Sequence, residues 1–280
     1  MRHDEPVTAG PGVVVRDAAT VMLVRDGATG LEVFMVRRHL GAAFVAGAYV
    51  FPGGAVDDAD READVATVCE GRSDAAASRA LGLEPPVGGL AYWVAAVREC
   101  FEEAGVLLAR LPGGSMLDTG DPDLAARFAG HRRAVHAGQA NLLDVCVQEG
   151  LELAVDGMHY FSHWVTPVGA PRRFDTRFFV ARAPAGQVAR HDEQETIAHH
   201  WIGPTEALAR HREGGYELIL PTLRSLEAIT RFDDAEALLR AAAAAPVPTG
   251  TRDGARIFLP GDVCSAPADL TLDRRRPCPT

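Results

Sequence analysis

The chain has 280 residues, with 28 basic and 38 acidic side chains and a formal net charge of −10. Phosphate backbones recruit Lys and Arg, so this balance argues against nucleic acid as the main partner. Every basic residue is Arg, which excludes a Lys base or a Lys Schiff base. An acidic protein that handles phosphates would need a metal ion or a local Arg cluster to offset repulsion.

The five cysteines are scattered without a CxxC pair, which indicates neither a zinc site nor a disulfide framework. The N-terminal residues carry no apolar signal core, and no apolar run approaches the ~18 residues of a membrane span. These features predict a cytoplasmic protein with reduced thiols and no membrane partner.

Strand patterns dominate the first part of the chain, after a polar segment at residues 1–16 that is expected to be a flexible lead-in. Residues 19–24 and 31–36 are apolar and flank the turn-forming RDGATG, which predicts a hairpin. A third short strand is predicted over 48–51, stopped by a Pro-Gly-Gly turn. An excursion with a short helix is expected over 61–90.

The later elements alternate between helices and strands. A helix is predicted over 91–105, ending at a Gly as helix termini prefer. Further helices and strands are predicted in chain order: helical residues 121–155, strands over 160–165, 177–181 and 201–202, and helices over 205–212, 222–230 and 234–244. This mixture predicts one α/β domain over 17–245 with helical insertions at 61–90 and 121–155. Residues 246–280 are expected to be a largely irregular C-terminal extension.

The helix over 91–105 carries three carboxylates on one face. At about 100° per residue, Glu99, Glu102 and Glu103 fall within about one-third of the circumference. Their i,i+3 and i,i+4 spacings bring like charges together, and Arg98 is expected to neutralise only one of them. The opposite side is apolar and predicts a buried stripe, formed by Val94, Val97, Phe101 and Ala104.

This carboxylate face has two interpretations. A solvated acidic surface is the simpler one. Clustered carboxylates beside a Gly-rich turn, whose carbonyl groups point to the same place, instead favour an all-oxygen site for Mg²⁺ or Mn²⁺.

The same residues resemble a known motif. The segment RECFEEAGV, residues 98–106, resembles the core of the Nudix box, and FPGG, residues 51–54, resembles the turn that opens the box. Asp60 stands in the position usually held by Glu. Between Asp60 and Arg98 lie 37 residues where the box has seven, so about 30 are inserted. The resemblance implies a Nudix-type α/β/α sandwich with a mixed sheet.

The resemblance also implies roles for individual residues in a metal-dependent diphosphate hydrolase. Glu102 and Glu103 would be metal ligands, and Glu99 either a ligand or the base that activates water. Arg98 would orient Glu99, and the carbonyl of Gly53 would complete the metal shell. The expected cofactor is Mg²⁺ or Mn²⁺.

A further carboxylate often comes from a loop across the site in this family. Glu193 and Glu195 are the candidates, and the spacing from Glu195 to Trp201 fits the family's later strand better. Glu195 is therefore the predicted additional catalytic residue.

The long insertion and several other segments are similar to a Nudix subfamily that includes peroxisomal coenzyme A diphosphatases. The similarity covers roughly residues 16–230, including RDAATVMLVRDG, HYFSHWVTP, PRRFDTRFFVA and LPTLRSLEAI. It implies cleavage of CoA or acyl-CoA to 3′,5′-ADP and (acyl-)phosphopantetheine. Because bidentate Arg suits phosphate, the predicted substrate ligands are Arg37, Arg38, Arg173 and Arg177.

Several alternatives stay open at this stage. ADP-ribose, NADH or a nucleotide sugar could replace CoA as substrate. A catalytically silent nucleotide sensor is a second class, although three intact glutamates argue against it. A structural protein with a coincidental acidic helix is a third, and it predicts no metal binding. Residues 121–155 could form a lid or a homodimer contact.

Overall fold

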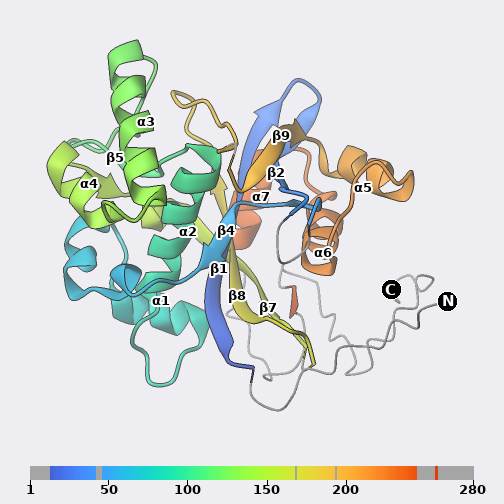
Figure 1. Ribbon diagram of the computed structural model, residues 1–280, viewed down its shortest axis with the longest axis horizontal. Coiled ribbons are helices and arrows are strands. Elements are labelled where there is room, and N and C mark those ends of the chain that lie inside the picture. Colours follow the sequence, from blue (N-terminus) through green and yellow to red (C-terminus); the bar gives the residue numbers. More distant parts are fainter. Residues whose placement is uncertain (1–12, 42–45, 168, 193, 245–255, 258–280) are drawn as a thin grey trace.

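A computed structural model describes residues 13–41, 46–167, 169–192, 194–244 and 256–257 (Figure 1). Most of the expected lead-in, nearly all of the expected C-terminal extension and the candidate Glu193 lie outside these residues. Among the described helices, none combines the length and the apolar character that crossing a bilayer requires.

In the described residues, eight strands form one mixed sheet in the order β10-β7-β8-β1-β2-β3, with β4 also paired to β1 and β9 to β2. The central strand β1 is parallel to β8 and antiparallel to β2 and β4. The strands are β1 (Val15–Gly27), β2 (Gly30–Arg38), β3 (Tyr49–Val50), β4 (Gly53–Ala55), β7 (Met158–Val165), β8 (Arg173–Arg182), β9 (Thr196–Ile202) and β10 (Arg256–Ile257). A separate pair consists of β5 (Ala109–Arg110) and β6 (Glu152–Leu153).

Helices cover both faces of the sheet and produce three layers (Figure 1). On one side lie α1 (Asp74–Leu81), α2 (Leu90–Ala104), α3 (Pro122–His136) and α4 (Leu142–Glu149). On the other side lie α5 (Pro204–Arg212), α6 (Leu220–Ile229) and α7 (Ala235–Ala243). Short 3-10 segments are η1 (Ala59–Arg61), η2 (Ala63–Val68) and η3 (Val155–Gly157).

The period of two along the central strand fixes which face each side chain covers. Val21 and Leu23 join the apolar core beneath α2, whereas Met22 and Val24 join the core beneath α6 and α7. Successive side chains of a strand point to opposite faces, so a continuous apolar run fits a sheet that is covered on both sides.

The structure differs from the sequence predictions at several strands. Strand β1 begins at Val15, inside the expected lead-in. Residues 53–55, expected to be only a turn, form β4 because Gly53 and Gly54 pair with Thr20 and Ala19 of β1. The short strands β5, β6 and β10 were not predicted, since two residues are too few to show an alternating pattern.

Helix α2 is more buried than expected. Every residue of α2 except Glu99 and Glu102 is buried, so there is no solvated carboxylate stripe. The inserted segment explains part of this burial, because Asp74 of α1 accepts a hydrogen bond at 2.9 Å from the N–H of Leu90 at the start of α2. The helix ends at Gly105, whose left-handed φ of 68° closes the last turn.

Candidate active site

Glu103 lies inside the protein where α2 passes β4. Its side chain belongs to a residue only 3% exposed, and its carboxylate accepts a hydrogen bond at 2.9 Å from the N–H of Gly53. Burial, together with the nearby charge of Glu99, raises the pKa of Glu103 well above its usual range. The strand backbone thus holds a carboxylate that is poorly stabilised as an anion unless a cation joins it.

Arg98 links the remaining acidic groups. Its Nη1 donates to both Glu99 and Glu102 at 2.9 Å, and its Nη2 donates to Asp60 at 2.9 Å and to the carbonyl of Ala55 at 2.7 Å. Arg98 therefore contacts three carboxylates, although its single positive charge balances only one of them. The planar guanidinium offers five N–H donors, and burial of Arg98 to 7% exposure directs them to several partners at once.

The Asp60–Arg98 pair joins two parts of the Nudix-like motif that are 38 positions apart in the chain. Asp60 is buried, and its Oδ1 and Oδ2 accept from Nε of Arg98 at 3.0 and 3.3 Å. Burial raises the pKa of Asp60, although the bonds from Arg98 act against that shift. The inserted residues form a loop whose two ends lie close together, so the two parts of the motif are in contact although they are distant in sequence.

The acidic group has the donor chemistry that a divalent cation requires. Burial and repulsion from Glu102 raise the pKa of Glu99 to about 8, even though Arg98 lowers it. Glu99, Glu102 and Glu103 offer oxygen ligands, which Mg²⁺ and Mn²⁺ prefer, and a cation would relieve their repulsion. In the described part of the chain, no three His, Cys, Asp or Glu side chains are arranged as a metal site. Glu99 and Glu102 are instead bonded to Arg98, and Glu103 to Gly53.

Gly54 permits the close approach of Glu99 to β4. A Cβ atom at Gly54 would lie 2.4 Å from Oε1 of Glu99. We expect Gly54→Ala to displace this flexible carboxylate, lowering kcat about tenfold or more while changing the Tm little. Steady-state kinetics and thermal denaturation measure the two effects. Gly130→Ala is a suitable control, because the nearest atom to the added Cβ, Nη2 of Arg133, lies 3.9 Å away. Gly214→Ala is not suitable, because Gly214 has a positive φ. An unchanged kcat would remove the positional role of Glu99.

Two of the predicted loop and strand residues approach Glu103. Besides the larger effects of burial and of the charge on Glu99, two other charges act on the pKa of Glu103. The charge of Arg38 lowers this pKa, and the charge of Glu195 raises it. Within the described residues, Nε of Arg38 is buried without a hydrogen-bond partner. Glu195 is exposed just before β9, and its carbonyl accepts from the N–H of His39 at 2.8 Å. The structure therefore brings Arg38 and Glu195 to the glutamates.

The other predicted substrate ligands have different partners. Arg37 donates to the carbonyl of Gly47 at 3.2 Å, and Arg173 donates to the carbonyl of Thr166 at 3.0 Å. Arg177 is buried, pairs with Asp175 and lies over the ring of Tyr92 at 5.5 Å. No interaction among the described residues joins Arg37, Arg173 or Arg177 to Glu99, Glu102 or Glu103.

Helix α3 supplies two side chains that the sequence did not reveal. Nε of Arg132 donates to the carbonyl of Glu102 at 2.8 Å, and Nη2 of Arg132 donates to the carbonyl of Arg190 at 3.0 Å. Nδ1 of His136 lies 3.5 Å from Oε2 of Glu102. The i,i+4 spacing of Arg132 and His136 shows that they share a helix face, but it does not indicate which element that face meets.

A three-layer α/β/α sandwich with three glutamates on a buried helix behind an FPGG segment defines a Nudix hydrolase. The family model described as the NUDT19 Nudix domain matches residues 15–227, and the chain belongs to this family. The resemblance to the Nudix superfamily and the predicted fold class are thereby confirmed.

Two curated relatives and one solved structure illustrate the similarity. The chain is 30% identical over 305 positions to the acyl-coenzyme A diphosphatase NUDT19 of Gallus gallus, covering 88% of this chain and 79% of that protein. It is 31% identical over 211 positions to the human protein of the same name, covering 64% and 55%. The crystal structure of a NUDIX hydrolase from Alicyclobacillus acidocaldarius is 29% identical with a TM-score of 0.65, covering 84% of this chain and 99% of that one.

Proposed function

We propose that this protein hydrolyses the diphosphate linkage of CoA or acyl-CoA, releasing 3′,5′-ADP and (acyl-)phosphopantetheine. The group formed by the buried Glu103, bonded to β4, and the half-buried Glu99 and Glu102, held by Arg98, is the observation that carries the proposal. The CoA substrate is supported by relatives named acyl-coenzyme A diphosphatases, one of them aligned over most of both chains.

The residues present fit a divalent cation, and we propose Mg²⁺ or Mn²⁺. Glu99, Glu102, Glu103 and the carbonyl of Gly53 would hold it. When bound, the ion neutralises charge on the diphosphate and lowers the pKa of the attacking water.

The chain's own groups then bind the substrate and accept the proton. The buried Nε of Arg38, which has no hydrogen-bond partner among the described residues, is suited to a phosphate oxygen, which would satisfy a donor that is otherwise costly to bury. Glu99 and Glu195 are the two candidates for the base. Arg37, Arg173 and Arg177 are kept as further proposed substrate ligands, with less support because their described contacts lie elsewhere.

The raised pKa of Glu99 predicts how stability depends on pH. Its ordinary value is 4.5 and its folded value about 8, so between these values the folded state binds more protons than the unfolded state. Stability from this group is therefore lost as pH rises through that window. A cation that binds the ionised carboxylate offsets this loss, so stabilisation by Mg²⁺ should grow with pH.

Thermal denaturation at pH 5.5, 7 and 8.5, with and without Mg²⁺, measures this effect. Glu99→Gln should flatten the pH dependence of the metal-free Tm relative to the unchanged protein. If the two proteins show the same dependence, Glu99 does not titrate in this window.

The substrate is tested by incubating the protein with Mg²⁺ or Mn²⁺ and CoA, acyl-CoA, ADP-ribose, NADH or a nucleotide sugar, with mass analysis of the products. We expect 3′,5′-ADP and the matching phosphopantetheine. Cleavage of only another compound would keep the reaction and overturn the CoA assignment. If the protein binds Mn²⁺ but hydrolyses none of these compounds, the nucleotide-sensing alternative would be favoured.

Location and assembly are further proposals. We propose a cytoplasmic protein without nucleic-acid partners, which cell fractionation and a DNA-binding assay test, and a homodimer, which sedimentation of the purified protein tests. The net charge of −10 supports the absence of nucleic-acid binding.

A further inference from the structure

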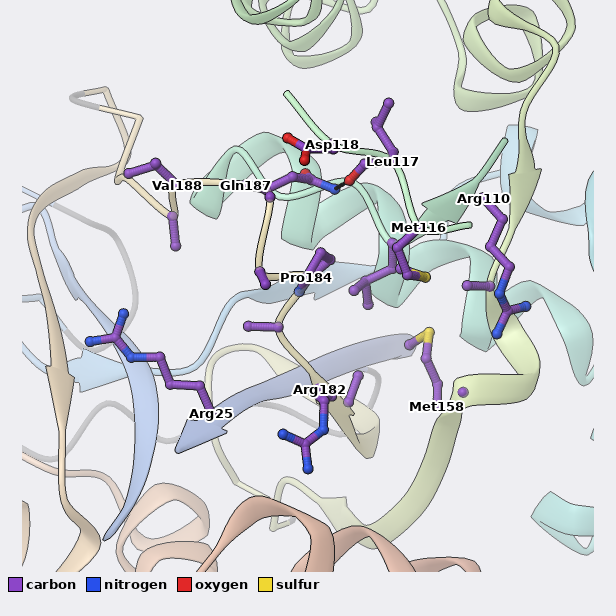
Figure 2. A pocket seen from close by; sticks show the side chains of 18 of the residues that line it. Arg25, Arg110, Met116, Leu117, Asp118, Met158, Arg182, Pro184, Gln187 and Val188 are labelled. Atoms are coloured by element: carbon purple, nitrogen blue, oxygen red, sulfur yellow. Dashed lines mark hydrogen bonds between the residues drawn. The ribbon is translucent and has the colours of Figure 1, made fainter. Parts of the chain in front are cut away.

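A large cavity lies near the C-terminal ends of β1 and β8. Its volume is about 1140 Å³, near or above the upper end of the roughly 300–1,000 Å³ common for small-molecule sites. Figure 2 shows Met116 and Met158 at one end of the view and Arg25 and Val188 at the other. A volume of this size has room for a large ligand rather than a single small group.

Two residues of the cavity lining contact the elements that carry the candidate site. Arg190, which lines the cavity, donates its backbone N–H at 2.8 Å to the carbonyl of Ala104, the residue after Glu103. His199, also in the lining, pairs with Val36, two residues before Arg38 on β2. A substrate whose diphosphate lies at Glu103 could thus extend one of its arms into the cavity.

The lining arginines differ in whether a carboxylate pairs with them. Arg190 makes no ion pair within the described part of the chain, so its exposed guanidinium is available to an anionic group at the Arg190 end of the cavity. The other lining arginines are neutralised by carboxylates: Arg25 by Glu32 at 2.7 Å, Arg110 by Asp156 at 2.7 Å and Arg182 by Asp26 at 3.0 Å. A second anionic group, such as the CoA 3′-phosphate, would gain little in the remote part of the cavity.

The aromatic rings in the lining are already in contact with other groups. The guanidinium of Arg25 covers the ring of Trp201 at 4.2 Å, and Phe34 packs against the same ring at 5.2 Å. The ring of His199 contacts that of His191 at 4.8 Å. Adenine sites usually use an aromatic face, so this lining does not favour the nucleotide end of CoA.

The remaining lining favours an uncharged, flexible chain. Its apolar side chains come from several elements: Leu108, Met116, Leu117, Met158, Ala181, Val188 and Ala189. Methionine side chains are unbranched and adapt to ligands of different shape. We propose that this cavity binds the acyl-pantetheine arm of the substrate, with the acyl chain against Met116 and Met158.

This inference rests on the proposed CoA diphosphatase activity and predicts a dependence on acyl length. Each methylene removed from water strengthens binding by a few-fold at most. For the unchanged protein, kcat/KM should therefore rise from CoA and acetyl-CoA to octanoyl-CoA and dodecanoyl-CoA.

The test fills the cavity. Met116→Trp should lower kcat/KM for dodecanoyl-CoA by about tenfold, while the value for CoA changes by less than about twofold. Val147→Trp is the matched control, because Val147 is 68% exposed on α4 and does not line the cavity. Met116→Ala serves as a second variant, which should retain hydrolysis of all four compounds if Met116→Trp fails to fold.

A binding measurement gives a readout independent of turnover. Without divalent metal, CoA carrying a brominated acyl chain should quench the fluorescence of Trp93, because Nε1 of Trp93 donates to the carbonyl of Met158 at 3.1 Å. Trp201→Phe should keep this quenching, because Trp201 lies under Arg25 at the other end of the cavity, and Trp164 lies in the core beneath α6 and α7.

The outcomes separate the inference from the function on which it rests. Equal loss for CoA and dodecanoyl-CoA in Met116→Trp, or no loss for either, would overturn the acyl assignment while leaving the diphosphatase activity intact. Binding of the brominated compound without quenching would overturn it as well. If the unchanged protein hydrolyses none of the CoA compounds, the proposed function fails and the inference fails with it.

Discussion

Glu103→Gln is expected to reduce kcat by about a thousandfold or more, comparable to removal of a principal electrostatic group from an active site. Glu103 is buried and close to Glu99 and Glu195, so the substitution removes a negative charge from the point where a cation is proposed to bind. Glutamine Oε1 can still accept the hydrogen bond from Gly53. The fold should therefore persist while the metal site is lost.

Stability without metal distinguishes this result from simple unfolding. Because burial and Glu99 raise the pKa of Glu103, removing its charge should leave the metal-free Tm unchanged or raise it. Mg²⁺ should then no longer raise the Tm of Glu103→Gln. Glu206→Gln is a suitable control on the exposed surface of α5. Full activity in Glu103→Gln would eliminate the proposed role.

Arg98→Met is expected to destabilise the protein by about 3–5 kcal/mol, because removal of one partner leaves buried charges uncompensated. The lost contacts include Asp60, Glu99 and Glu102, all on one guanidinium. Denaturation with urea measures the loss, and kcat should fall as Glu99 loses its orientation.

Two further variants separate charge from geometry. Arg98→Lys keeps the charge but lacks the forked donors, so it should recover only part of the stability. Asp60→Asn combined with Arg98→Met should cost less than the sum of the two single changes, since the two side chains contact each other. Additive losses would show that the Asp60–Arg98 contact contributes little.

Much of the fold was predictable because apolar residues recur along the sequence with the periods of helices and strands. The hairpin of β1 and β2, helix α2 and the helices of residues 122–149 follow apolar patterns and turn residues that act locally. The short strands β4, β5 and β6 were not predictable in this way, because they exist only through pairing with distant partners.

The residues of the candidate site also differ in whether local sequence patterns reveal them. Glu99, Glu102 and Glu103 were identified because three helical positions close in sequence must share a face. Arg132, His136 and Arg190 were not, because they reach α2 from other elements.

The sequence by itself determined the Nudix motif, the mixed α/β architecture and the three carboxylates proposed to hold the metal, since these follow from residue type and spacing within single elements. The tertiary structure decided how the carboxylates are held and charged. It buries Glu103 against Gly53, places Asp60 on Arg98 although 37 residues lie between them, and forms the cavity near the C-terminal ends of β1 and β8. The physical reason is that burial, ion pairing and cavity shape depend on which distant segments pack together, and no local pattern of residues records that.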